Sequence, residues 1–301
     1  MRDELLGILA VNLPAAVRWA GAIARQLRHH DIALGNKQSG YAATDALTLA
    51  DLSVQELLVA ALRDMGPVVR RCRLEAEESS GDVDAFARES DWVVAIDPID
   101  GTRHYRDRTG GYAVMLHVRT VETIHYSLVY HPEDGPMGSW LEAHDERLVL
   151  GPDDWSRDAR ATLDALPSVD TGDRRSMRRV LVGGFLDRDD VRAEAVAAAG
   201  LEPVLQPADS PYALVARGEL GGAVIHTPNV YDFPVIVHLA RLRGGDAVWV
   251  HDGRPIDFRT VWLDERAAML RLPGIVACAI DRDVLATLVE TARTWSPARY
   301  G

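Results

Sequence analysis

Cysteine and positive charge are both scarce in this sequence. Only Cys72 and Cys278 occur among 301 residues, too few and too far apart for a disulfide framework or a thiolate metal site. Lys and Arg together number 33 against 45 Asp and Glu, a formal net charge of -12 with a pI near 5.3. Such a chain is not expected to attract nucleic acid or anionic lipid. We therefore expect a cytoplasmic protein with no nucleic-acid polymer and no membrane as partner.

Long hydrophobic runs are also missing, and no stretch is expected to span a bilayer. The start, MRDELLGILAVNLP, carries Asp3 and Glu4 and ends in Pro14, unlike the cationic start and cleavage site of a signal peptide. Apolar residues recur at helical spacing over residues 5–27, and Pro14 stands where a second helix could begin. The 47% of hydrophobic residues suffices for a large core in one domain or two joined ones.

The order of apolar runs divides the chain into two halves of different type. A helix is expected over residues 51–65, and strand-like runs follow at residues 92–96, 111–119, 124–130 and 138–142, which indicates an antiparallel sheet. From about residue 180, strands and helices alternate to the final helix. We therefore predict an α/β protein with an α+β half over residues 1–172 and an α/β half over residues 173–301.

Two carboxylates three residues apart end a short apolar run in the stretch AIDPIDGT. Pro98 fixes the backbone between Asp97 and Asp100, so both side chains can turn toward one point at the carboxyl end of a strand, where open sheets place ligands. Carboxylate and main-chain oxygens suit Mg²⁺, whereas histidine or thiolate would suggest zinc. A glycine turn at Gly101 and Thr102, leading into a short helix, would expose N–H groups that cradle phosphate oxygens. In isolation the motif is more often an ordinary turn.

Further acidic residues stand at the ends of other expected elements. Glu77 with Glu78 ends a strand-like run, while Asp51 and Asp232 each open a helix. Each of them alone could be a helix cap or a solvated acid. Their combination with the AIDPIDGT motif is what makes a functional site the better interpretation.

Four segments together resemble the inositol monophosphatase family of Mg²⁺-dependent, lithium-sensitive phosphatases. They are KQSGYAATDALTLAD, EAEES, WVVAIDPIDGT and VYDFPVIVHLARLRGG, in this order and at these separations. The resemblance extends from about residue 5 to residue 258. It implies a layered αβαβα sandwich, a homodimer, and hydrolysis of a small phosphorylated metabolite.

The resemblance implies a site for two or three Mg²⁺ ions. Glu77, Asp97 and the carbonyl oxygen of Ile99 would bind the first ion. Asp97, Asp100 and Asp232 would bind the second, so that Asp97 bridges the two. Glu77 would also contact a third, weakly held ion.

The catalytic roles also follow from the resemblance. Thr102 with Asp51 would orient and deprotonate the attacking water, and Gly101 with Thr102 would hold the phosphate. Lys37 would lie on the loop that the family closes over the site. In-line displacement by water needs no phosphoenzyme, and no activated Ser or Cys nucleophile is evident.

The departures from the family pattern concern the substrate. Gln206-Pro207, followed by Asp209 and Ser210, replaces the usual Gly-Ser or Gly-Thr, and Ile225 replaces the glutamate that grips an inositol hydroxyl. Isoleucine would leave a polyol's hydroxyl groups buried without partners. Asp209 and Ser210 are therefore candidate contacts to a hydroxyl or an amine of a sugar, nucleoside or amino-alcohol phosphate. The alternative is a catalytically silent relative that binds a phosphorylated ligand without turnover.

Overall fold

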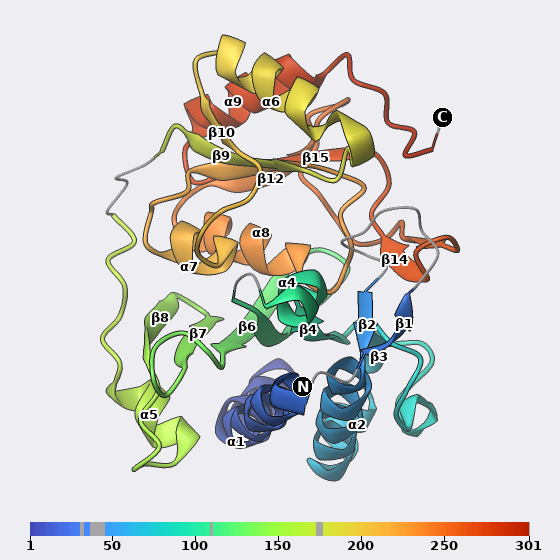
Figure 1. The fold of residues 1–301 in the computed structure, drawn as a ribbon, viewed down its shortest axis with the longest axis vertical. Coiled ribbons are helices and arrows are strands. Elements are labelled where there is room, and N and C mark those ends of the chain that lie inside the picture. Colours follow the sequence, from blue (N-terminus) through green and yellow to red (C-terminus); the bar gives the residue numbers. More distant parts are fainter. Residues whose placement is uncertain (31–32, 37–45, 109–110, 173–176, 301) are drawn as a thin grey trace. The chain divides into compact units, whose positions relative to one another are not determined.

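The computed structural model describes residues 1–30, 33–36, 46–108, 111–172 and 177–300. The chain divides into two compact units (Figure 1). The first comprises Met1–Ser168 and Asp264–Met269, and the second comprises Val169–Leu263 and Leu270–Gly301. The mixture of helices and sheets confirms the predicted α/β class.

The first unit is built on a six-stranded sheet. Its strands follow in the order β3 (Arg73–Ala76), β4 (Val93–Asp100), β5 (Ala113–Arg119), β6 (Ile124–His131), β7 (Ser139–His144) and β8 (Arg147–Pro152). β3 runs parallel to β4, and every other pair is antiparallel, so the expected antiparallel sheet is largely confirmed. A separate pair is formed by β1 (Ala33–Asn36) and β2 (Ala46–Thr48). β4 therefore lies inside the sheet, one strand from its edge.

Helices cover one face of this sheet. α1 (Arg2–His30) and α2 (Leu49–Asp64) pack against each other and against the central strands (Figure 1). Alternate β4 residues such as Val94 and Ile96 are buried in the core that these helices share with the sheet, because side chains of a strand alternate between its two faces. The remaining helices of the unit are short: α3 (Pro67–Arg70), the 3₁₀ turn η1 (Val83–Ala85), α4 (Thr102–Asp107) and α5 (Ala159–Ala165).

The long helix α1 corrects two expectations from the sequence. It continues through Pro14, where a second helix was predicted to begin. A proline inside a helix leaves the carbonyl four residues earlier without its N–H partner, and here Arg160 Nη1 donates to the oxygen of Ala10 at 3.1 Å. Among the described residues α1 is also long and apolar enough to cross a membrane by length and composition, although no such stretch was expected. Its residues Leu5 and Leu9 are fully buried in the core of the unit.

The second unit is a sheet with helices on both faces. The strand order is β10 (Glu202–Val204), β9 (Arg179–Gly183), β11 (Gly222–His226), β15 (Ile275–Ala279) and β12 (Asp246–Trp249). α6 (Asp189–Ala198) and α9 (Arg282–Ala292) lie on one side, and α7 (Pro211–Ala216) and α8 (Phe233–Leu242) lie on the other (Figure 1). The 3₁₀ turn η2 (Leu186–Arg188) and the short strands β13 (Trp262–Asp264) and β14 (Met269–Arg271) complete the described elements.

Candidate metal centre

A β-bulge places Asp97 and Asp100 on the same face of the first unit's sheet. The antiparallel register pairs Asp97 with Met115 and Asp100 with Ala113, so β4 advances three residues while β5 advances two. In a regular strand without a bulge, two side chains three positions apart point to opposite faces. The bulge explains why β4 extends to Asp100, although the strand-like run predicted from the sequence covered only residues 92–96.

The two carboxylates are close enough to share a ligand. One carboxylate oxygen of Asp97 and one of Asp100 lie within 4.8 Å of each other. The Asp97 residue is 3% exposed, and a buried carboxylate requires positive charge or hydrogen-bond donors around it. The pair offers hard oxygen donors without histidine or thiolate, which is the donor chemistry that suits Mg²⁺.

Glu77 is delivered to the same end of the sheet by the parallel strand β3. Ala76 pairs with Ile96, and the Glu77 amide donates to the oxygen of Ile96 at 3.3 Å. The next residues of the two strands are therefore Glu77 and Asp97. Parallel neighbours end at one edge of a sheet, so the register accounts for two of the predicted metal ligands standing next to each other.

Thr102 connects the carboxyl end of β4 with helix α2. Its hydroxyl lies 2.9 Å from the carbonyl oxygen of Ile99 and 3.2 Å from Oδ1 of Asp51. Asp51 is in the first turn of α2 and is 1% exposed. Gly101, which directly precedes α4, has φ +85°, a left-handed conformation that residues with a side chain rarely adopt. The structure thus brings together the two residues that the sequence assigned to proton transfer.

Asp232 belongs to the second unit and directly precedes α8. The side chain of Asn229 organises this turn: its oxygen accepts hydrogen bonds from the amides of Tyr231 and Asp232, and its nitrogen donates to Asp232 Oδ2 at 3.0 Å. Burial raises the pKa of Asp232 to about 6, and the hydrogen bond from Asn229 opposes that shift. Asn229 was not identified from the sequence, where its only signal is an asparagine three residues before the aspartate.

The predicted substrate contacts have other partners in the structure. Asp209 accepts a hydrogen bond from Arg217 at 2.9 Å, and Ser210 is the N-terminal cap of α7. Both belong to the second unit. Lys37 lies outside the described residues. The structure therefore gives Asp209 and Ser210 local structural roles within their own unit.

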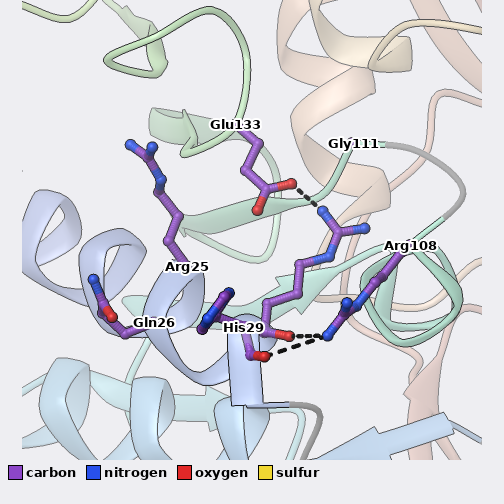
Figure 2. A pocket seen from close by; sticks show the side chains of 7 residues that line it. Arg25, Gln26, His29, Arg108, Gly111 and Glu133 are labelled. Atoms are coloured by element: carbon purple, nitrogen blue, oxygen red, sulfur yellow. Dashed lines mark hydrogen bonds and ion pairs between the residues drawn. The ribbon is translucent and has the colours of Figure 1, made fainter.

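A basic pocket lies beside α4 in the first unit (Figure 2). Its volume is about 920 Å³, and it is lined by residues of α1, of the segment after α4 and of the turn after β6: Arg25, Gln26, Arg28, His29, Arg108, Gly111 and Glu133. Arg28 is ion-paired with Glu133 and donates to the oxygens of His104 and Tyr105 in α4. Arg108 donates to the oxygens of Arg28 and His29 at the end of α1. These arginines therefore join the carboxyl ends of α1 and α4, the helix that Thr102 begins.

Comparisons with known proteins give one family match over part of the chain and similar solved structures over most of it. The model of the inositol monophosphatase family matches residues 7–151, whereas no curated protein sequence gives a significant match. The structure of suhB, an extragenic suppressor protein from Bartonella henselae, has a TM-score of 0.67 at 14% identity and covers 97% of this chain and 100% of its own. Inositol monophosphatase from Anabaena (Nostoc) has a TM-score of 0.63 at 17% identity and covers 98% of both chains.

CysQ from Bacteroides thetaiotaomicron, a bacterial member of the inositol monophosphatase family, has a TM-score of 0.64 at 17% identity and covers 91% of this chain and 97% of its own. At these identities the solved structures establish the fold alone. Residues 7–151 match the model of the inositol monophosphatase family, and nearly the whole chain has a fold similar to those of these solved structures.

Proposed function

We propose that this protein is a Mg²⁺-dependent phosphatase that hydrolyses a small phosphate monoester by direct attack of water. The match of residues 7–151 to the model of the inositol monophosphatase family supports a phosphoric monoester hydrolase. The observation that carries the finer proposal is the Thr102 hydroxyl, which lies within hydrogen-bond distance of both Asp51 and the Ile99 carbonyl, directly after the two carboxylates that share a face. These contacts support the proposal that Asp51 is a proton acceptor next to a cation site.

The ion would be held by oxygen atoms only. Asp97 and Asp100 supply two carboxylates of the first unit, Glu77 supplies a third, and Ile99 supplies its carbonyl. We propose that Asp232 of the second unit adds a further carboxylate. When bound, Mg²⁺ would neutralise charge on the phosphate oxygens and make water easier to deprotonate. Two or three ions, as the family resemblance implies, would balance these acids.

Thr102 would transfer the proton of the attacking water to Asp51. A hydroxyl group has one hydrogen, so Thr102 can donate to Ile99 or to Asp51 but not fully to both. Donation to Asp51 is the arrangement that proton transfer requires, and it would leave the Ile99 carbonyl available as an oxygen ligand. The lone pairs of the Thr102 oxygen then accept a hydrogen bond from water, and Asp51 receives the proton through the threonine. Neither residue forms a covalent bond to phosphorus.

The substrate class proposed is a sugar, nucleoside or amino-alcohol phosphate. Ile225 is unsuited to a hydroxyl group, and inositol phosphates are therefore the less favoured substrates. The test is phosphate release from a panel of these esters, measured with Mg²⁺, with chelator, and with Mg²⁺ plus lithium. We expect hydrolysis of at least one class that requires Mg²⁺ and is inhibited by lithium. Tight binding of an ester in calorimetry with no phosphate released would instead support the silent, ligand-binding alternative.

A further inference from the structure

We propose that Gln55 is a positioning residue of the metal centre, which holds the segment Glu77–Ser80 in place and thereby aims Glu77. The inference rests on the proposed function, because Glu77 is a proposed metal ligand. Gln55 lies in α2 and is fully buried. A buried amide must have hydrogen-bond partners, so the identity of those partners shows what the side chain holds.

All the hydrogen bonds of the Gln55 amide go to one segment. Its oxygen accepts from the amide of Glu78 at 2.9 Å. Its nitrogen donates to the oxygen of Glu78 at 2.5 Å and to the oxygen of Ser80 at 2.8 Å. A primary amide has two hydrogens and one acceptor oxygen, and each of these functions is used on the residues that directly follow Glu77.

This segment needs such support because the sheet no longer supplies it. β3 ends at Ala76, and the bond from the Glu77 amide to Ile96 continues its pairing with β4 by one residue. The backbone then turns away toward Gly81, whose amide donates to Glu56 Oε1 at 2.7 Å. Two successive residues of helix α2 therefore hold this part of the chain. Gln55 binds Glu78 and Ser80 within the segment, and Glu56 binds Gly81 directly after it.

The same face of α2 also carries Asp51. Residues four apart in a helix lie one above the other, so Asp51 and Gln55 are fixed to one rigid element. Asp51 bonds to Thr102 on one side, and Gln55 fixes the residue after Glu77 on the other. The spacing between the proton acceptor and this metal ligand is thus set by a helix rather than by a loop, which gives the precision that a catalytic site requires.

The first test compares Gln55→Leu with Tyr126→Phe. Leucine has a similar volume but removes every hydrogen bond to the segment. Tyr126 is also buried in the first unit, and its hydroxyl bonds to Glu142 at 2.9 Å in strands away from the site, so it is a matched control for the loss of a buried hydrogen bond. Metal affinity is measured by calorimetry with Mn²⁺ and no substrate. We expect Gln55→Leu to weaken Mn²⁺ binding about tenfold or more and Tyr126→Phe to leave it unchanged.

A kinetic measurement separates positioning from general destabilisation. For Gln55→Leu, the Mg²⁺ concentration that gives half-maximal activity should rise, while kcat at saturating Mg²⁺ should largely recover, because the ion can still order the segment at a cost in affinity. Gln55→Asn, whose shorter amide cannot span the same distance, should act in the same direction. If both variants melt at lower temperature but bind Mn²⁺ like the wild type, the residue is structural only and the proposal is wrong.

Hydrogen exchange provides a test on the wild-type protein. It needs no substitution, so misfolding of a variant cannot affect the result. The amide of Glu78 should be protected in metal-free buffer, because Gln55 rather than the ion holds it. Exchange as fast as in an open loop until Mn²⁺ is added would contradict the proposal. A wild-type protein that releases no phosphate from any ester would defeat the proposed function, whereas an active wild type with unaltered Gln55 variants would defeat only this inference.

Discussion

Oγ1 of Thr102 and Oδ1 of Asp51 are 3.2 Å apart, although the two residues lie on different elements and 51 positions apart in the chain. Asp51 is almost completely buried in α2, and Thr102 opens α4 directly after the bulged strand β4. The threonine therefore links the buried carboxylate of Asp51, the proposed proton acceptor, to the end of the strand that carries Asp97 and Asp100. A threonine placed only to cap a helix would not need this partner.

Removing the Thr102 hydroxyl should abolish proton transfer without removing the metal ligands. We expect Thr102→Val to lower kcat by roughly 10²–10⁴-fold, the usual contribution of general acid–base catalysis, while calorimetric Mn²⁺ affinity changes little. Thr102→Ser keeps the hydroxyl and should retain most of the activity. Equal rates for the valine and wild-type enzymes would show that the proton takes another route.

Removing either β4 carboxylate should weaken the binding of the metal ion. Asp97→Asn and Asp100→Asn each replace a charged oxygen donor by a neutral amide, so Mn²⁺ affinity and Mg²⁺-dependent phosphate release should both fall by at least tenfold. Asp64→Asn is the control, because this carboxylate, with a side chain 69% exposed, lies at the far end of α2 beside Arg63. Retention of full activity by Asp97→Asn would refute the metal-assisted mechanism.

The β4 bulge can be tested by changing the chain length. Deletion of Pro98 removes the extra residue and leaves Asp97 and Asp100 two positions apart, so regular pairing with β5 would keep both side chains on one face. Pro98→Ala keeps the length and serves as the matched control. We expect both variants to retain measurable Mn²⁺ binding. Complete loss of binding in the deletion variant alone would mean that the bulge does more than bring the two carboxylates to one face.

The sequence was sufficient for those features that depend on neighbouring residues. The α/β class, α2, α8 and the approach of Glu77, Asp97 and Asp100 to one strand end all follow from local pattern and motif. The bulge was not predictable in this way, because it is defined by the pairing of β4 with Met115 and Ala113 of β5.

Residues whose partners are remote were equally beyond local pattern. Pro14 was expected to divide a helix. In the structure, the Ala10 carbonyl that the proline leaves open accepts a hydrogen bond from Arg160, which is 150 positions away. From the sequence, Gln55 is an ordinary polar residue of a helix, because no local pattern shows that it hydrogen-bonds to Glu78 and Ser80. Positioning residues of this kind are recognised by their hydrogen-bond partners, which only the folded chain supplies.

The two cysteines should report separately on the stability of the two units. Cys72 is fully buried in the first unit and Cys278 in the second, and burial raises the pKa of the thiols to about 11 and about 12 respectively, above the ordinary value of 9.0. Because only the thiolate reacts with an aromatic disulfide, both thiols should be inert at pH 8 in the folded protein and reactive after unfolding. Because these pKa values are raised, the folded state holds the thiol protons more tightly than the unfolded state does. The free energy of unfolding should therefore decrease as pH rises from about 9 toward 11 or 12.

Cys72→Ala leaves Cys278 as the probe of the second unit, and Cys278→Ala leaves Cys72 as the probe of the first. Labelling each variant across a urea series gives its midpoint, the urea concentration at which half of its thiol has become reactive. Circular dichroism on the same samples gives the loss of helix. We expect the thiol of each variant to become reactive only at urea concentrations at which the helix signal of that variant falls. Mn²⁺ should shift the Cys72 midpoint upward, because the proposed ligands Glu77, Asp97 and Asp100 all lie in the first unit and an ion bound only by the folded state stabilises it. Rapid labelling of Cys72 in the absence of urea would contradict its burial, and a midpoint insensitive to Mn²⁺ would mean that the first unit does not hold the ion.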